Sequence, residues 1–274
     1  MTDSLSSYTL VFMHMPKAAG STLQRIIDRQ YEGQKIFNID GNSIQSVQAS
    51  IDRLRALSEA ERSEIRCLKG HVPFGVGQWL RSPVRYITMF REPVARAISD
   101  YNFAMSTPEH ILYKELNEKA MTLLQDVEMR ARLGFANMYT RLLSGCVSWD
   151  NFMLSGDLPQ DALEIAKENM RKCAVVGITE RFDESILLFK KRLGWSDCNY
   201  ARENVTPSVR VSRHQISGEA EEAIREYCKL DIELYRYCLE IFDGNIRDAG
   251  RDFQADLAAF SKSNSVYQQG TPVS

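Results

Sequence analysis

The sequence lacks a dominant charge, a long apolar run and an export signal. Across 274 residues, 34 Lys and Arg nearly balance 36 Asp and Glu, which leaves a net charge of −2 at pH 7. The protein as a whole therefore does not attract nucleic acid or anionic membranes, and any anion-binding site must depend on local positive charge. No segment approaches the roughly 18 apolar residues of a membrane span, and the N-terminus lacks a basic, apolar signal pattern. We expect a cytoplasmic protein with no nucleic-acid partner and no integral membrane anchor.

Paired cysteines and metal-ligand spacings are also missing. The six cysteines are scattered without a CxxC pair, and only four histidines are present. A chain without an export signal keeps its thiols reduced, which argues against a disulfide framework. We expect neither a structural zinc site nor a catalytic metal.

The apolar segments that are present predict an α/β fold. Hydrophobic residues make up 44% of the chain, enough for a sizeable core. Three short apolar runs predict strands, at Tyr8–His14, Val84–Phe90 and Ala174–Ile178, and each precedes a helical pattern. Weaker strand candidates lie at 35–39 and 65–69. This alternation predicts a P-loop-like central parallel sheet flanked by helices, with ligands at the carboxyl ends of the strands.

The length fits a single domain, which we place at residues 1–260. A mostly helical insertion is expected at about 107–170, and one long helical pattern runs over 217–242. Residues 261–274 are polar, and we expect a flexible tail there.

The first candidate site lies where the first strand meets a helix, in the sequence HMPKAAGST. Backbone N–H groups at a helix N-terminus attract anions, small residues allow close approach, and Lys17 adds positive charge. A Walker A loop places its lysine after the second glycine, whereas Lys17 precedes Gly20, so this loop has a different order. The alternative is a plain strand-to-helix turn with Ser21 as its N-cap. The predicted anion-binding residues are Lys17, Ala18, Ala19, Gly20, Ser21 and Thr22.

The second candidate site is FREPVARAISDY, in which Arg91 ends a strand and Ser99 lies in the following helix. A guanidinium group binds phosphate through paired hydrogen bonds, and a hydroxyl adds a donor. The alternative for Arg96 is a surface pair with Asp100. Two anion-suited loops at separate strand ends predict a ligand with two well-separated phosphates, such as a nucleoside 3′,5′-bisphosphate.

Between these loops, His71 follows a candidate strand in the sequence LKGHVPFG. A histidine with a pKa near working pH suits a general base, while a structural histidine is the alternative. His14 precedes the first loop and could line the site, although packing explains its position equally well. We expect His110 and His214 at the surface.

Together the PKxxGST-like loop and the RxPxxRxxS segment resemble the sulfotransferases that use 3′-phosphoadenosine 5′-phosphosulfate (PAPS). The GHVPF segment resembles the carbohydrate branch typified by heparan sulfate 2-O-sulfotransferase. The resemblance implies in-line transfer of a sulfuryl group from PAPS to an acceptor hydroxyl, expected on a carbohydrate or glycolipid. It makes His71 the general base, with Lys17 stabilising the departing bisphosphate, and assigns the 3′-phosphate to Arg91 and Ser99.

Weaker resemblances involve the acceptor and the adenosine end of PAPS. The segment NMYTRLLSG suggests that Asn137 or Arg141 reaches the acceptor, and Thr206 lies in a segment that resembles the loop covering adenosine. Many relatives have Thr and Gly where this chain has Ala18 and Ala19, which keeps the loop small but removes one hydroxyl. The alternatives left open are a P-loop-like ATP-dependent kinase and a non-catalytic nucleotide-binding module.

Overall fold

The computed structural model describes residues 7–41, 43–147, 149, 156–201 and 211–270. Its strands form one parallel sheet in the order β2-β3-β1-β4-β5. The expected α/β architecture is therefore confirmed, and every candidate strand segment contains a strand. The strands are β1 (Thr9–Met13), β2 (Lys35–Ile39), β3 (Ile65–Gly70), β4 (Val84–Phe90) and β5 (Val175–Ile178).

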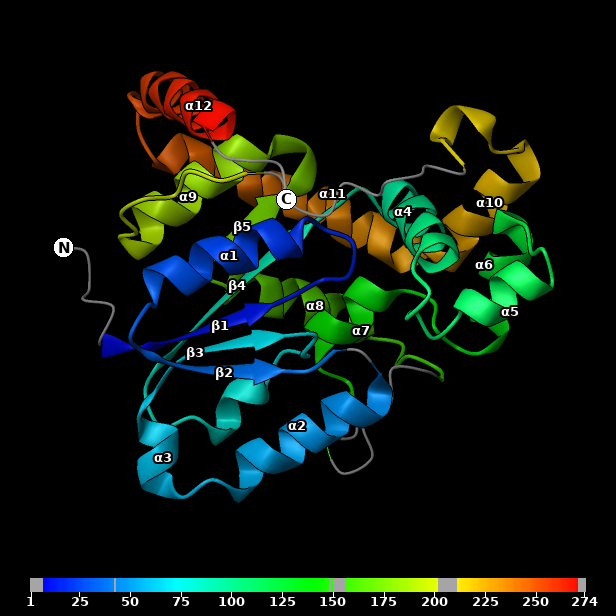
Figure 1. The fold of residues 1–274 in the computed structure, drawn as a ribbon, viewed down its shortest axis with the longest axis horizontal. Coiled ribbons are helices and arrows are strands. Elements are labelled where there is room, and N and C mark those ends of the chain that lie inside the picture. The colour runs from blue at the N-terminus through cyan, green and yellow to red at the C-terminus, as the bar shows by residue number, and fades with distance from the viewer. Residues whose placement is uncertain (1–6, 42, 148, 150–155, 202–210, 271–274) are drawn as a thin grey trace.

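Helices cover both faces of this sheet. In the view of Figure 1, α1, α9 and α12 lie above it, whereas α2 and α3 lie below it. The helices are α1 (Gly20–Gln30), α2 (Ile44–Ala56), α3 (Glu59–Ser63), α4 (Pro93–Ser106), α5 (Tyr113–Glu118), α6 (Leu123–Arg132), α7 (Met138–Ser144), α8 (Ala162–Arg171), α9 (Phe182–Leu193), α10 (Gly218–Tyr227), α11 (Lys229–Asp248) and α12 (Phe253–Gly270).

The central strand β1 lies at the heart of the main core. All five of its residues are buried, because parallel strands covered by helices on both faces need apolar side chains on both sides. The edge strand β2 instead exposes Lys35 and Asn38. The apolar run that predicted β1 thus reflects its central position.

A second apolar cluster joins α4, α5, α6 and α10. Its buried members include Tyr101, Leu116, Val127 and Ile224. These helices lie to the right of the sheet in Figure 1, beyond the carboxyl ends of the strands. Among the described residues, no helix is both long enough and apolar enough to cross a membrane.

The predicted single helix over 217–242 is instead two helices, α10 and α11, that meet at Cys228. Asn137 bridges the break. Its N–H donates to the Tyr227 carbonyl at 3.1 Å, and its side-chain oxygen accepts from the N–H groups of Leu230 and Asp231 at 2.9 and 3.4 Å. A side chain distant in sequence thus binds the backbone groups that the break leaves unpaired.

Most of the segment that was predicted to be a flexible tail is helical instead, because α12 continues through Gly270. Asn264 is buried and accepts a 2.7 Å hydrogen bond from the Tyr200 N–H, while the Ser261 hydroxyl donates to Asp183 at 2.7 Å. These polar contacts help to attach α12, a helix without a pronounced apolar face, to the domain. Residues 271–274 lie outside the described part of the chain.

Candidate active site

The carboxyl ends of three neighbouring strands lie level with one another. Met13 of β1 pairs with Gly70 of β3 and with Thr88 of β4. The His14 N–H donates to the Gly70 carbonyl at 2.9 Å, and the Thr88 hydroxyl donates to the Met13 carbonyl at 2.9 Å. Because the three candidate sites follow β1, β3 and β4, the strand order alone brings them to one edge of the sheet.

The loop between β1 and α1 has the backbone of an anion site. Lys17 and Ala19 adopt left-handed conformations, with φ of 60° and 56°, and Ala18 between them does not. Such alternation turns successive N–H groups toward one concave side. Ala19 is the N-cap of α1 but has no side-chain acceptor for the first N–H groups, and the first turn holds no acidic residue. The loop therefore suits an anion from outside the helix.

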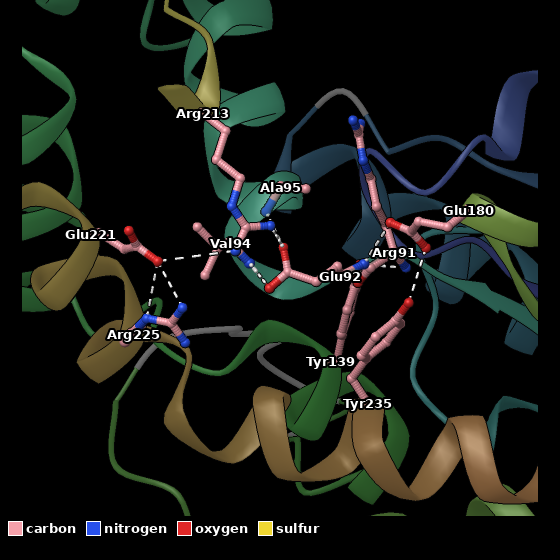
Figure 2. Close-up of polar contacts among 10 residues, drawn as sticks. All are labelled: Arg91, Glu92, Val94, Ala95, Tyr139, Glu180, Arg213, Glu221, Arg225 and Tyr235. Atoms are coloured by element: carbon pink, nitrogen blue, oxygen red, sulfur yellow. Dashed lines mark hydrogen bonds and ion pairs between the residues drawn. The ribbon is translucent and has the colours of Figure 1, made fainter. Parts of the chain in front are cut away.

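Glu92 organises the turn between β4 and α4. Its carboxylate accepts hydrogen bonds from the N–H groups of Val94 and Ala95 at 3.2 and 2.8 Å, and so caps α4. Its own N–H donates to Glu180 at 2.9 Å, and its carboxylate pairs with Arg213 at 2.9 Å (Figure 2). The cap fixes where α4 begins, and therefore where Ser99 lies.

Arg91 precedes this cap and is held through its backbone. The Tyr139 hydroxyl lies 3.2 Å from both the N–H and the carbonyl oxygen of Arg91. Figure 2 shows the Arg91 side chain extending away from the contact between Glu92 and Glu180. Its guanidinium group donates to the Lys17 carbonyl at 3.4 Å, so the two loops are directly connected.

The two loops and His71 line one cavity of about 1870 Å³. Its lining includes residues at the strand ends, residues of α4 and residues of the 107–112 segment. This volume exceeds the usual range for drug-sized ligands, so the space can hold a nucleotide together with a second molecule. The predicted residues that line it are Lys17, Ala19, Gly20, Ser21, Thr22, His71, Arg91 and Ser99.

Two histidines form part of the cavity wall. The rings of His14 and His71 stack with their centroids 4.3 Å apart and their planes at 21°. Nδ1 of His71 lies 2.7 Å from the carbonyl oxygen of His14. Because a carbonyl can only accept, Nδ1 of neutral His71 carries the proton and Nε2 is the basic nitrogen. Burial lowers the pKa of His71, which keeps this nitrogen unprotonated near neutral pH.

Charge in the cavity is balanced around Lys17. Burial lowers the pKa of the Lys17 ammonium, and the Asp100 carboxylate acts against that shift. Although burial acts to raise the pKa of Asp100, Arg130 and Arg96 hold it below its ordinary value. Asp100 pairs with Arg130 at 2.9 Å and not with Arg96, which is buried at 3% exposure. The surface pair between Arg96 and Asp100, which the sequence offered as the alternative, is thus absent, and Asp100 belongs to a buried network instead.

Four predicted site residues lie elsewhere or cannot be placed. The Ala18 side chain is buried in the core at 1% exposure, so only its backbone could meet a ligand. Asn137 holds the break between α10 and α11, and Arg141 donates to the carbonyls of Ala136 and Gly156. Neither Asn137 nor Arg141 lines the cavity. Thr206 lies outside the described residues.

The structure adds residues that the sequence did not single out. His110, expected at the surface, is half-buried and lines the cavity, and burial lowers its pKa. The Phe103 ring lies edge-on to His110, with centroids 5.7 Å apart. Arg130 of α6 also lines the cavity. Their places depend on packing between distant segments, for which one sequence offers no signal.

The described residues contain no cluster of three or more His, Cys, Asp and Glu side chains suited to a metal ion. Two comparisons with known proteins bear on the site. A family model described as galactose-3-O-sulfotransferase matches residues 2–264. Heparan-sulfate 6-O-sulfotransferase 1 from Homo sapiens is 26% identical over 189 residues, which cover 60% of this chain and 45% of that protein. The chain therefore spans about half the length of this curated relative.

Proposed function

The chain belongs to the galactose-3-O-sulfotransferase family, and we propose that it transfers a sulfuryl group from PAPS to a hydroxyl group of its acceptor. Membership of this family, together with the resemblance of the motifs, supports activity as a carbohydrate sulfotransferase. The single observation that supports the finer proposal is the convergence of two anion-suited loops and a histidine base on one cavity.

The cavity residues fit a donor with two separated anionic groups. The left-handed loop, Lys17 and the start of α1 suit the 5′-phosphosulfate end. Arg91 and Ser99, on the neighbouring turn and helix, suit the 3′-phosphate. PAPS, when bound, supplies an activated sulfuryl group attached to phosphate. The chain contributes the positive charge and the backbone donors that hold it.

The role proposed for His71 is to remove the proton of the acceptor hydroxyl group. Its Nε2 is the nitrogen left free by the bond between Nδ1 and the His14 carbonyl, and it can accept the hydroxyl proton. As the acceptor oxygen forms its bond to sulfur, the bond between sulfur and the phosphate oxygen breaks. Lys17 stabilises the negative charge that this phosphate oxygen gains. Protons and charge balance without a further reactant.

For the acceptor, we propose a galactose-bearing glycan or glycolipid. This proposal rests on the description of the family and on the size of the cavity, which can hold a sugar beside the donor. The hydroxyl that receives the sulfuryl group must reach Nε2 of His71.

Calorimetric titration of the full chain with adenosine 3′,5′-bisphosphate and with ATP, without magnesium, tests the donor site. We expect tight binding of the bisphosphate and negligible binding of ATP. Arg91→Ala should weaken bisphosphate binding about tenfold or more, since a hydrogen bond to a charged group contributes about 1.5–3 kcal/mol. Arg81→Ala is the matched control, because Arg81 is exposed and pairs with Glu59. Preference for ATP, or equal bisphosphate binding by Arg91→Ala, would contradict the proposed donor site.

A further inference from the structure

His14 is a half-buried histidine that takes no chemical part in the proposed transfer reaction. It follows β1 directly, before the phosphate loop begins. Its ring stacks on the Phe12 ring and on the His71 ring, at centroid distances of 5.6 and 4.3 Å respectively. The same residue supplies the carbonyl that binds Nδ1 of His71. His14 therefore contacts the base through both its ring and its backbone.

The His14 ring is fixed by its other neighbours. Nδ1 lies 3.1 Å from the side-chain nitrogen of Gln24, one turn into α1. Because an amide nitrogen can only donate, Nδ1 of His14 accepts, and Nε2 of the neutral ring carries the proton. That Nε2 lies directly against Gly20, where a Cβ atom would come within 1.8 Å of it. Gly20 thus leaves room for the ring that stacks on the base.

A corresponding fit surrounds His71. A Cβ atom on Gly41, two residues beyond the end of β2, would come within 2.1 Å of Cδ2 of His71. The two rings therefore occupy a slot between Gly20 and Gly41, with little space for either to turn. A base held in this way can present Nε2 to the acceptor in one orientation.

Burial, His71 and Lys17 together hold the pKa of His14 well below its ordinary value. A neutral ring can lie against His71 without repelling the proton that His71 takes up. The charged groups around the two rings are Lys17 of the phosphate loop, Lys69 of β3 and Asp100 of α4, and Asp40 beside Gly41 lines the same cavity. The ring that stacks on His71 is that of His14, so the shielding of His71 on this side depends on the His14 ring.

We propose that His14 is a positioning residue for the base: its carbonyl oxygen selects the His71 tautomer, and its neutral ring shields and orients the His71 imidazole. This inference rests on the proposed role of His71 as the base. It differs from a donor-binding role for His14, because it predicts an effect on the base and on turnover while bisphosphate affinity stays unchanged.

Nuclear magnetic resonance of the full-length chain with isotope-labelled histidine tests this proposal without an acceptor. Only four histidines are present, so single substitutions can assign every imidazole signal. In the wild type, we expect the nitrogen shifts to place the neutral His71 proton on Nδ1, and its pKa to lie below the ordinary value. His14→Ser should raise the pKa of His71, because water reaches the exposed ring face. His14→Phe keeps a flat apolar ring and should leave that pKa low.

A proton on Nε2 of neutral wild-type His71 would overturn the proposal, and this result needs no variant. It would also be overturned if His14→Ser left the pKa of His71 unchanged, or if His14→Phe behaved like His14→Ser. These outcomes are independent of catalysis. Absence of sulfuryl transfer by the wild type would instead count against the proposed function.

A second test measures the kinetics of sulfuryl transfer from PAPS to methyl β-galactoside, which serves as the acceptor probe. We expect His14→Ser to lower kcat on the order of tenfold through loss of orientation, with bisphosphate affinity equal to that of the wild type. His14→Phe should restore most of kcat. Wild-type kcat in His14→Ser, or a loss of bisphosphate affinity that accounts for the whole defect, would contradict a positioning role.

Discussion

The ammonium nitrogen of Lys17 lies 3.5 Å from the centroid of the Phe103 ring. Phe103 lies one turn beyond Ser99 on α4, so the helix that suits the 3′-phosphate also holds the lysine of the other loop. A cation over an aromatic face contributes about 0.5–2 kcal/mol, with the larger value in desolvated sites. The contact holds the Lys17 ammonium against α4.

Phe103→Leu should therefore reduce kcat/KM by about fivefold, since it removes an attraction of about 1 kcal/mol that orients Lys17. Phe103→Tyr keeps an aromatic face and should retain near-wild-type turnover. Steady-state kinetics with varied PAPS measures the difference. If Phe103→Leu and Phe103→Tyr are equally active, the contact has no role in catalysis.

Gly41→Ala should displace the His71 ring, because the new methyl group would lie 2.1 Å from Cδ2 of that ring. We expect a lower kcat and a loss of about 1–3 kcal/mol of stability from overpacking. Gly218→Ala at the start of α10 is the matched control, since nothing lies within 4 Å of its added methyl group. Turnover and thermal unfolding of both variants test this fit, and wild-type behaviour of Gly41→Ala would show that the slot is not tight.

Stability should fall as the solution is acidified below about pH 6.5, the ordinary histidine pKa. The folded state holds the pKa values of His14 and His71 below that value, so the unfolded chain binds protons that the folded chain does not. Each group then contributes a slope of at most about 1.4 kcal/mol per pH unit. Urea unfolding at several pH values measures the slope. His14→Phe should reduce it, with exposed His214→Gln as the control; an unchanged slope in His14→Phe would contradict the burial of a neutral His14.

Asn137 should prove structural, because its side-chain oxygen serves two backbone N–H groups where α10 meets α11. Asn137→Gly should cost about 1–3 kcal/mol of folding free energy through lost hydrogen bonds. Asn137→Ala should cost more, since the residue has a φ of 56° that favours glycine over alanine. Chemical unfolding checks the order. A changed acceptor KM with unchanged stability would instead support the contact with the acceptor that the sequence suggested.

The sheet was predictable because its strands are short apolar runs buried on both faces, as in β1. The level ends of β3, β1 and β4 then explain why Lys17, His71 and Arg91 share a cavity. Helix α12 was not predictable from apolar periodicity, because part of its attachment comes from buried Asn264. The stack of His14 on His71 and the place of His110 depend on how distant segments pack, which local sequence patterns do not encode.

Transfer of labelled sulfate from PAPS to galactose-terminated acceptors, by the wild type and by His71→Asn, tests the central claim most directly. We predict transfer by the wild type, and a roughly 10²- to 10⁴-fold lower kcat in His71→Asn, the range typical of a lost general base. Bisphosphate affinity should be the same in both proteins. Full activity of His71→Asn would contradict the assigned base, and magnesium-dependent turnover of ATP without any sulfuryl transfer would contradict the proposed function itself.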